Sequence, residues 1–480
     1  MIFSSAPFFV FLVAVLAVYL GASTVRQRAG VLLAASIIFY ASWKPAYLLL
    51  LGASLAVNYL VYNLLLKKRS LAVLVAGIAV NLLTLGACKY SRFAFQSALW
   101  IGSEFDWVRG TTSTPEWLNW ALPLGISFYT FHMLSAIIDV YRGHWAKPVT
   151  FTRWCLYVTF FPHLIAGPIL RPGQLIDQLG ELKPLEISNL RLGAAIFAAG
   201  LVKKALLADN LAPIADRLYA SPDALGFASA WIATLAFAFQ IYFDFSGYSE
   251  MAIGLARLFG VWLPRNFLYP YISRSPREFW RRWHITLSQW LRDYLYVPLG
   301  GSHGTVARTQ FNILVTMLLG GLWHGANWTF VFWGALHGLL LVGSRLCELA
   351  LGKFGTSGRL LAARFRSLLG LPLTFVLVCF TWVFFRAQGF DDAWQISGAM
   401  LGMQSGHESG PPIRLYEMGI VAISGLIAFL EPALAGAIEA RGIGSWWRLP
   451  FVLRGASYAA LVLLLTILGG QTQKFIYFDF

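Results

Sequence analysis

Long apolar stretches, repeated along almost the whole chain, constrain its fold more than any other feature. A helix needs about 17 to 25 predominantly apolar residues to cross a bilayer, and we count about ten to twelve such stretches. The composition agrees, because 58% of the 480 residues are hydrophobic and only 12% are charged, against about 25% charged in a typical soluble domain. The sequence therefore predicts an all-α, polytopic integral membrane protein with about ten to twelve transmembrane helices.

The basic residues indicate an orientation in the membrane rather than a nucleic-acid partner. The net charge is +15, but the basic side chains lie mainly between apolar stretches, where they keep loops on the cytoplasmic side. With the N-terminus outside, the early connections on the inner side hold Arg26, Arg28, Lys67, Lys68, Arg69, Arg142, Lys147 and Arg153, and those on the outer side hold Lys44, Lys89, Arg92 and Arg109. The inner side is richer in basic residues, which supports an N-terminus on the outer side, and the count of later spans then places the C-terminus on the outer side too.

The character of the chain changes after its first five apolar stretches. The segment "FPHLIAGPILRPG" carries Pro162, Pro168 and Pro172, which break a helix, and a broken backbone at membrane depth must be surrounded by protein or by a water-filled cavity. The basic, aromatic segment "RSPREFWRRWHITLSQWLRDYLY" cannot cross a bilayer and is expected at the inner face. We expect one domain over 1–480, subdivided into regular spans (1–140), a core with re-entrant and interfacial helices (141–345), further spans (346–470) and an aromatic tail (471–480).

Two histidines stand out by their setting. His324 lies between glycines in "LLGGLWHGANWTFVFWGALHG", and an ionisable side chain at membrane depth is a functional candidate. The alternative is a neutral imidazole bonded to a neighbouring helix. His284 ends the basic "FWRRWH", and its alternative role is that of an interfacial histidine among aromatic rings. His337 follows His324 by thirteen residues, about 220° around a helix, so we expect no metal site from that pair.

Other charged residues admit two interpretations. Asp244 and Glu250 either pair with arginines and hold helices together or take part in chemistry. Arg281 and Arg282 either anchor the inner face or draw an anionic ligand into a cleft. The phosphate loop GxxxxGK[ST] and an HxxxxD pair are missing from the sequence. The four cysteines lie far apart and suggest neither a disulfide framework nor a zinc site.

Four segments carry a family resemblance: "FFPHLIAGPILRP", "YFDFSGYSEMAIGLARLFG", "EFWRRWHITLSQWLRDYLYVPLGG" and "GGLWHGANWTFVFWGALHG". They resemble the membrane-bound O-acyltransferases, in particular the bacterial branch that contains the alginate O-acetyltransferase membrane subunit and the teichoic-acid D-alanyl transfer protein. The resemblance runs from residue 1 to about 390 and favours the alginate type. It implies helices around a tunnel that crosses the membrane, with the family histidine at His324 and a second functional histidine at His284.

The resemblance also implies a chemistry. Acetyl-CoA is the expected donor, bound by Arg281, Arg282 and Trp283 rather than held as a tight cofactor, and no metal is expected. His324 is the expected base for transfer to a hydroxyl, which is protonated at neutral pH. The terminal "FIYFDF" resembles an aromatic motif of this branch, so we expect Tyr477 to accept the acetyl group as a relay. The alternative is a tail that only anchors at the membrane interface.

The expected function is therefore transfer of acetyl groups from a cytoplasmic thioester across a bacterial inner membrane, for O-acetylation of an extracytoplasmic polysaccharide. Alginate is the first expectation, followed by cellulose or another exopolysaccharide and by peptidoglycan. Periplasmic esterase-fold acetyltransferase subunits are the expected partners that reach the polysaccharide, with membrane lipid around the chain and no nucleic acid. An alternative of another class is a transporter or flippase without a covalent step, in which His324 and Asp244 form a proton relay.

Overall fold

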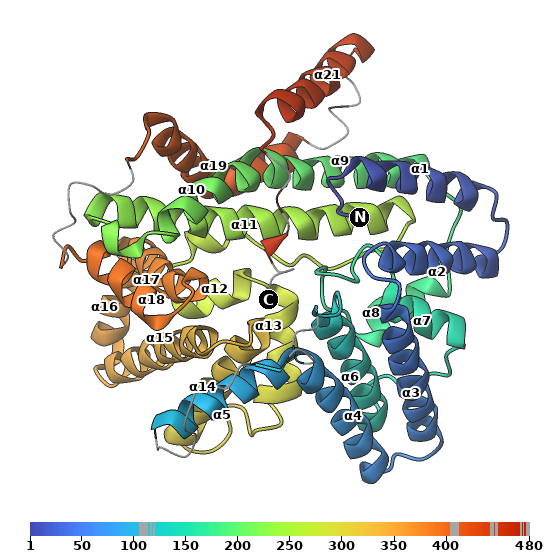
Figure 1. Ribbon diagram of the computed structural model, residues 1–480, viewed down its shortest axis with the longest axis horizontal. Coiled ribbons are helices and arrows are strands. Elements are labelled where there is room, and N and C mark those ends of the chain that lie inside the picture. The colour runs from blue at the N-terminus through green and yellow to red at the C-terminus, as the bar shows by residue number, and fades with distance from the viewer. Residues whose placement is uncertain are drawn as a thin grey trace. The chain divides into compact units, whose positions relative to one another are not determined.

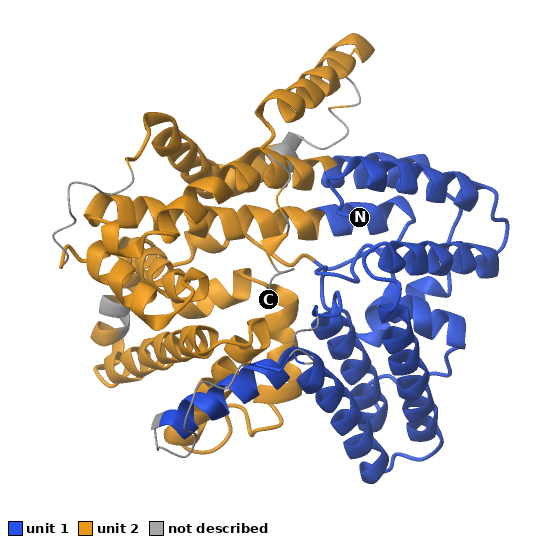
Figure 2. Ribbon diagram, viewed as in Figure 1, with its two compact units in different colours: residues 1–197, 251–264, 480 blue, residues 198–250, 265–479 orange. Residues whose placement is uncertain are grey.

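The computed structural model describes residues 1–104, 114–115, 118, 121–403, 412–441, 446, 450–470, 473 and 475–476 of the chain. All the regular secondary structure within these ranges is helical (Figure 1). The described residues belong to two compact units, formed by residues 1–197 with 251–264 and by residues 198–250 with 265–479 (Figure 2). The all-α class predicted from the apolar stretches is confirmed. The subdivision expected at residues 140 and 345 stays a prediction.

The first unit contains the N-terminal helices. They are α1 (Ala6–Leu20), α2 (Val25–Ala41), α3 (Tyr47–Lys67), α4 (Leu71–Lys89), α5 (Ser91–Glu104), α6 (Ile126–Arg142), α7 (Phe151–Thr159), α8 (Pro172–Leu179) and most of α9 (Ile187–Val202). The helix break predicted from the prolines is confirmed, since residues 160–171 contain no helix between α7 and α8. Nearly all of this irregular segment is buried, as a non-helical backbone in a membrane protein requires.

The second unit holds the remaining helices. Its first part comprises the π-helix η2 (Lys203–Ala208), α10 (Asp209–Tyr219), the 3₁₀ turn η3 (Pro222–Ala224), α11 (Phe227–Leu258, which also enters the first unit), the 3₁₀ turn η4 (Pro270–Ile272), α12 (Pro276–Arg282), α13 (Ile285–Leu291) and the π-helix η5 (Arg292–Tyr296). Its second part comprises α14 (Val306–His324), α15 (Trp328–Gly352), α16 (Gly355–Leu368), α17 (Gly370–Arg386), α18 (Phe390–Met400), α19 (Leu415–Arg441) and α21 (Phe451–Leu468).

Six of the described helices are long and apolar enough to cross a membrane: α3, α4, α11, α15, α19 and α21. A seventh span is possible if α16 and α17, which meet at a bend of 66°, act together. This count is below the ten to twelve apolar stretches because many of those stretches fold into helices of only 15 to 17 residues, such as α1, α2 and α6. The chain is a multi-pass membrane protein whose spans are interrupted more often than their hydropathy indicates.

Candidate active site

A close contact between α14 and α15 sets the position of His324. A Cβ atom added to Gly321 would lie 2.2 Å from the carbonyl oxygen of Phe330, and one added to Gly334 would lie 2.3 Å from that of Met317. Only glycine permits this approach of two backbones. His324 is the last residue of α14, and the Asn327 side chain then caps α15 by accepting from the Thr329 N–H at 3.1 Å. The glycines in the motif therefore serve the packing of the hairpin that carries the histidine.

Aromatic rings enclose the His324 imidazole. Its ring centre lies 5.0 Å from those of Trp323 and Trp333 and 5.4 Å from that of Phe385, each in an edge arrangement. The residue is 2% exposed. These rings restrict the imidazole to a narrow range of orientations and exclude bulk water, which strengthens any electrostatic interaction made there. His324 is thus a buried, oriented ionisable group.

His284 lies between α12 and α13 in an unusual backbone conformation. Its φ and ψ angles are 41° and 56°, in the left-handed region that residues other than glycine seldom adopt. The side chain is fully buried, and Nδ1 lies 3.2 Å from Oδ1 of Asn266. The same oxygen accepts hydrogen bonds from the N–H and the hydroxyl of Thr286, at 3.2 and 3.0 Å. The strained conformation is held by this bonded group, and such strain is often found at functional sites.

These contacts define the protonation of His284. The backbone N–H of Thr286 must donate, so the Asn266 atom that it meets is the carbonyl oxygen. Nδ1 then carries the proton that it donates to this oxygen, and Nε2 of the neutral ring bears the lone pair. Burial lowers the pKa of His284, which lies outside the six membrane-spanning helices, to about 3. Nε2 has no hydrogen-bond partner among the described residues, so it can accept a proton or a hydrogen bond from a ligand.

A chain of ring contacts in the second unit connects the two histidines. His284 packs edge-on against Phe245 of α11 at 4.7 Å and lies 6.2 Å from Trp323, whose ring is in turn 5.0 Å from His324. His284 and His324 therefore border one aromatic cluster, although forty residues separate them in the sequence. His337 has protein partners on both nitrogens: the Trp280 indole N–H at 3.3 Å from Nδ1 and the Thr381 hydroxyl at 3.0 Å from Nε2.

A cavity of about 580 Å³ opens beside this cluster. Four arginines and several apolar side chains line it, among them Arg277, Arg281, Arg292, Arg345, Trp280, Ile285 and Met317. None of the described residues that line it is acidic. Arg277 and Arg292 pair with the neighbouring carboxylates Glu348 and Asp293, whereas Arg281 and Arg345 have no ionic partner among the described residues. The cavity is thus basic at its charged groups and apolar elsewhere, as a pocket for an anionic organic ligand would be.

Two ring contacts lead from this cavity to His324. Trp280, on the cavity wall, lies 5.8 Å from Trp333, and Trp333 lies 5.0 Å from His324. Ile285, also on the wall, directly follows His284 in the chain. The cavity therefore adjoins the surroundings of both histidines.

The three predicted donor-binding residues fall in different places. Arg281 lines the cavity. Arg282 forms an ion pair with Glu278 at 2.9 Å and donates to the carbonyl oxygen of Leu268 at 3.1 Å, so it holds α12 in place. Trp283 is fully buried and stacks on Phe279 at 5.6 Å. A direct contact with a donor in this cavity is open to Arg281, while Arg282 and Trp283 are placed to support the scaffold; their binding role stays a prediction.

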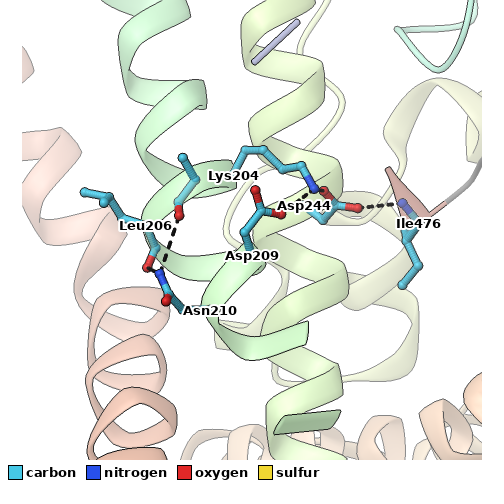
Figure 3. Close-up of polar contacts among 7 residues, drawn as sticks. Lys204, Leu206, Asp209, Asn210, Asp244 and Ile476 are labelled. Carbon is cyan, nitrogen blue, oxygen red and sulfur yellow. Dashed lines mark hydrogen bonds and ion pairs between the residues drawn. The ribbon is translucent and has the colours of Figure 1, made fainter. Parts of the chain in front are cut away.

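Tyr477 lies outside the described residues, but its neighbours Phe475 and Ile476 do not. Phe475 is fully buried, stacks on Tyr248 at 4.5 Å and meets Phe245 edge-on at 5.7 Å. The backbone N–H of Ile476 donates to Oδ2 of Asp244 at 2.8 Å (Figure 3). Phe245 contacts both Phe475 and His284. The segment that directly precedes Tyr477 is therefore attached to the same aromatic cluster as the histidines.

The sequence did not reveal the partners of the buried acids. Asp244 pairs with Lys204 at 2.7 Å, and Glu250 pairs with Lys203, so lysines rather than the expected arginines form these ion pairs. Glu431 of α19 also binds Lys203. The available signal was the pair of lysines inside the apolar run "AAGLVKKALLADN". The sequence gave no comparable signal that Asn266 would bind His284, because an asparagine in a loop is common.

Comparison with known proteins gives consistent results. A sequence profile of the membrane-bound O-acyltransferase family matches residues 143–360. The chain is 42% identical over 407 residues to a protein from Azotobacter vinelandii named "Probable alginate O-acetylase AlgI", covering 83% of this chain and 78% of that protein. The protein of the same name from Pseudomonas aeruginosa is also 42% identical, over 83% of this chain and 75% of its own. A Helicobacter pylori protein named "Peptidoglycan O-acetyltransferase" is 36% identical over 78% of this chain and 73% of its own. Given this extent of similarity, with the buried histidines in the matched region, the chain belongs to the membrane-bound O-acyltransferase family.

Proposed function

We propose that this protein takes acetyl groups from a cytoplasmic acyl thioester, carries them across the inner membrane and supplies them for O-acetylation of an extracytoplasmic polysaccharide. The family and the named relatives support the O-acetyl transfer. The single observation that carries the proposal is that His284, His324 and the segment preceding Tyr477 meet at one aromatic cluster beside a basic cavity.

The basic cavity is the proposed site of the donor. Acetyl-CoA is strongly anionic at its nucleotide end, and Arg281 and Arg345 offer it cationic charge that no described carboxylate neutralises. The apolar part of the lining, which includes Trp280 and Met317, suits the uncharged arm that carries the thioester. A volume of about 580 Å³ lies within the range of ligand pockets, and it accommodates part of such a donor while the rest extends toward solvent.

The proposed transfer is a single exchange of bonds. His324, as general base, takes the proton of the Tyr477 hydroxyl, and the phenolic oxygen attacks the thioester carbonyl carbon. A carbon–oxygen bond forms, the carbon–sulfur bond breaks, and the departing thiolate receives the proton from the imidazolium. Nε2 of His284, whose lone pair is free by the hydrogen-bond pattern, accepts a hydrogen bond from the reacting hydroxyl or thiol and orients it. The products are an aryl acetate on the tail and free CoA.

An aryl acetate suits onward transfer. A phenol has a pKa of about 10, so phenolate leaves more readily than the alkoxide of a sugar. We propose that a periplasmic esterase-fold acetyltransferase subunit removes the acetyl group from Tyr477 and passes it to the polysaccharide. Alginate is the acceptor favoured by the names of two of the relatives described above, and peptidoglycan is supported by the name of a third. Cellulose and other exopolysaccharides would require only a different partner.

The proposed function is tested with purified protein and acetyl-CoA in detergent, without an ion gradient. We expect a burst of free CoA thiol that does not exceed the amount of protein, because each tail accepts one acetyl group until a partner removes it. A protein that leaves acetyl-CoA intact under these conditions would be a transporter or flippase instead. In the structure Asp244 is engaged by Lys204 and Ile476, an arrangement that disfavours the proton relay with His324 which such a transporter would need.

A further inference from the structure

The segment that follows α21 is bonded through its backbone to η2, α10 and α11. The carbonyl oxygen of Leu468 accepts from the Asn210 side chain at 2.9 Å, and the N–H of Gly470 donates to the carbonyl oxygen of Ala205 at 3.2 Å. A Cβ atom on Gly470 would lie 2.8 Å from the Asp209 backbone, so only glycine fits there. A backbone bond from Gln473 reaches the Asp209 carboxylate, and Ile476 reaches Asp244. These contacts use backbone atoms of the segment and do not depend on its side chains.

A buried triad receives the end of this segment. Lys204 lies between Asp209 and Asp244, at 2.7 Å from one oxygen of each, and all three side chains are 3% exposed (Figure 3). Two carboxylates around one ammonium leave an excess negative charge, which is expensive in a buried site. The N–H groups of Gln473 and Ile476 are the donors that this excess requires. Without the segment the triad would therefore lack these two hydrogen-bond donors. The negative charge of the triad complements the backbone N–H groups of the segment.

The π-helix η2 contributes to this arrangement. Its two consecutive lysines form ion pairs with different carboxylates. Lys203 binds Glu250 and Glu431, and Lys204 binds Asp209 and Asp244. The Lys203 group joins α11 to α19 and contains none of the described residues of the terminal segment. The Lys204 triad has the same kinds of charged group but adds the tail backbone as a partner. π-Helical turns are uncommon and often occur at functional sites, and here the turn accompanies two buried charge clusters.

Side-chain packing fixes the segment relative to His284. One turn of α11 contacts both Phe475 and Ile476. The residues of this turn that make the contacts are Asp244, Phe245 and Tyr248. Phe245 also contacts His284 at 4.7 Å. The same turn of helix thus holds both the tail and the imidazole. Because Tyr477 directly follows Ile476 in the chain, the anchor at Ile476 limits where the tyrosine hydroxyl can reach.

We propose that the Lys204–Asp209–Asp244 triad is a docking site for the backbone of the terminal segment, and that it sets the register in which Tyr477 is presented for acetylation. This assignment rests on the proposed function, in which Tyr477 is the acceptor. The three residues are positioning residues, since they act through the tail backbone. Because the anchor uses the N–H groups of residues 473 and 476, it is independent of whether the tyrosine carries an acetyl group.

Substitutions at Ile476 isolate the hydrogen bond from the side chain. Ile476→Pro removes the N–H that donates a hydrogen bond to Asp244 and leaves the triad intact. Ile476→Ala keeps the N–H and serves as the matched control. We expect Ile476→Pro to slow acetylation of Tyr477 about tenfold or more, because a hydrogen bond to a charged group is lost, with an unchanged KM for acetyl-CoA. Ile476→Ala is expected to stay within about threefold of the wild type, since it loses only packing.

Hydrogen exchange of the terminal peptide tests the docking independently of acetyl transfer. In Asp244→Asn a single side-chain oxygen must accept hydrogen bonds from both Lys204 and Ile476, so amides 473–476 should exchange faster than in the wild type. The remaining tail amides of Ile476→Pro should also exchange faster. Amides of α14, which do not contact the triad, should exchange as before and so report that the fold persists. Equal exchange of the tail in the wild type and both variants would overturn the docking site. Protected tail amides without acetyl on Tyr477 would support the docking site and contradict the relay instead.

Discussion

At the scale of single residues, His284 has a defined tautomer before any substrate binds. Asn266 receives its Nδ1–H, so Nε2 is the basic nitrogen. Replacement by asparagine should preserve the backbone, since asparagine tolerates the left-handed region better than most residues. We expect His284→Asn to fold but to lose about 10²-fold or more in acetyl transfer, the range for a residue that accepts a proton or orients one. Thiol release from acetyl-CoA measures the loss, and wild-type activity in a folded His284→Asn protein would show that the residue is structural only.

Acid stability provides a second test of His284. The unfolded imidazole binds a proton below about pH 6.5, while burial keeps the folded one neutral down to about pH 3. The unfolded state therefore takes up more protons in this window, so the stability conferred by the neutral form is complete above pH 6.5 and is lost as the pH falls toward 3. Between pH 7 and pH 5 the wild type should lose about 2 kcal/mol more than His284→Asn.

Thermal unfolding in detergent at the two pH values measures this difference. The other buried histidines are present in both proteins, so their contribution cancels. The same acid-induced loss in the wild type and in His284→Asn would contradict a neutral, buried imidazole at this position.

Sequence and structure differ in what they reveal about individual residues. His324 was identifiable because an ionisable residue in an apolar run is rare. Asp244 was identifiable as a buried acid for the same reason, but its partners were not, because Lys204 is forty residues away and Ile476 is farther still. The local pattern of a sequence reports burial well, whereas pairing across helices depends on the tertiary fold. Tyr477, outside the described residues, remains a prediction from resemblance.

At the scale of elements, the α14–α15 hairpin positions His324 through glycine contacts. Gly334→Ala would place a methyl group 2.3 Å from the Met317 carbonyl oxygen, so the helices must separate. We expect a loss of about 1–3 kcal/mol, as for other overpacked sites, and reduced acetyl transfer. Gly343→Ala is the matched control on the same helix, since nothing lies within 4 Å of its added Cβ. It should be neutral or stabilise by up to about 1 kcal/mol.

Thermal unfolding of both variants, together with thiol release, measures the outcome. Equal stability of Gly334→Ala and Gly343→Ala would contradict the close packing of this hairpin. The break between α14 and α15 falls at "WHGAN", which interrupts two apolar runs in the sequence. The π-helices η2 and η5 were not predicted, since an extra residue in a helical turn leaves no signal in hydropathy.

At the scale of the whole molecule, the basic cavity should determine affinity for the donor. Replacing both Arg281 and Arg345 by glutamine removes the two charges that no described acid neutralises. We expect KM for acetyl-CoA to rise about tenfold or more with little change in kcat, because a charge-assisted contact to phosphate contributes mainly to binding. Arg364→Gln is the control, since this exposed arginine of α16 lies outside the cavity. An unchanged KM in the double variant would place the donor elsewhere.

Composition alone was sufficient to predict a membrane protein. With 12% charged and 58% hydrophobic residues, the chain has too few charged side chains to cover its apolar surface in water. Composition overstated the number of uninterrupted spans because apolar runs say where a segment is buried and not whether its helix is continuous. Six described helices meet the length for a span, while others stop at 15 to 17 residues or bend.

The central claim is that Tyr477 accepts an acetyl group in a reaction that requires His324. Mass spectrometry of the C-terminal peptide after incubation of the purified protein with acetyl-CoA tests it most directly. We predict a mass increase of one acetyl group on Tyr477 in the wild type and in Ile476→Ala, and its absence in His324→Ala with the fold retained. A Tyr477→Phe protein that still supplies acetyl groups to the polysaccharide at the wild-type rate would contradict the account.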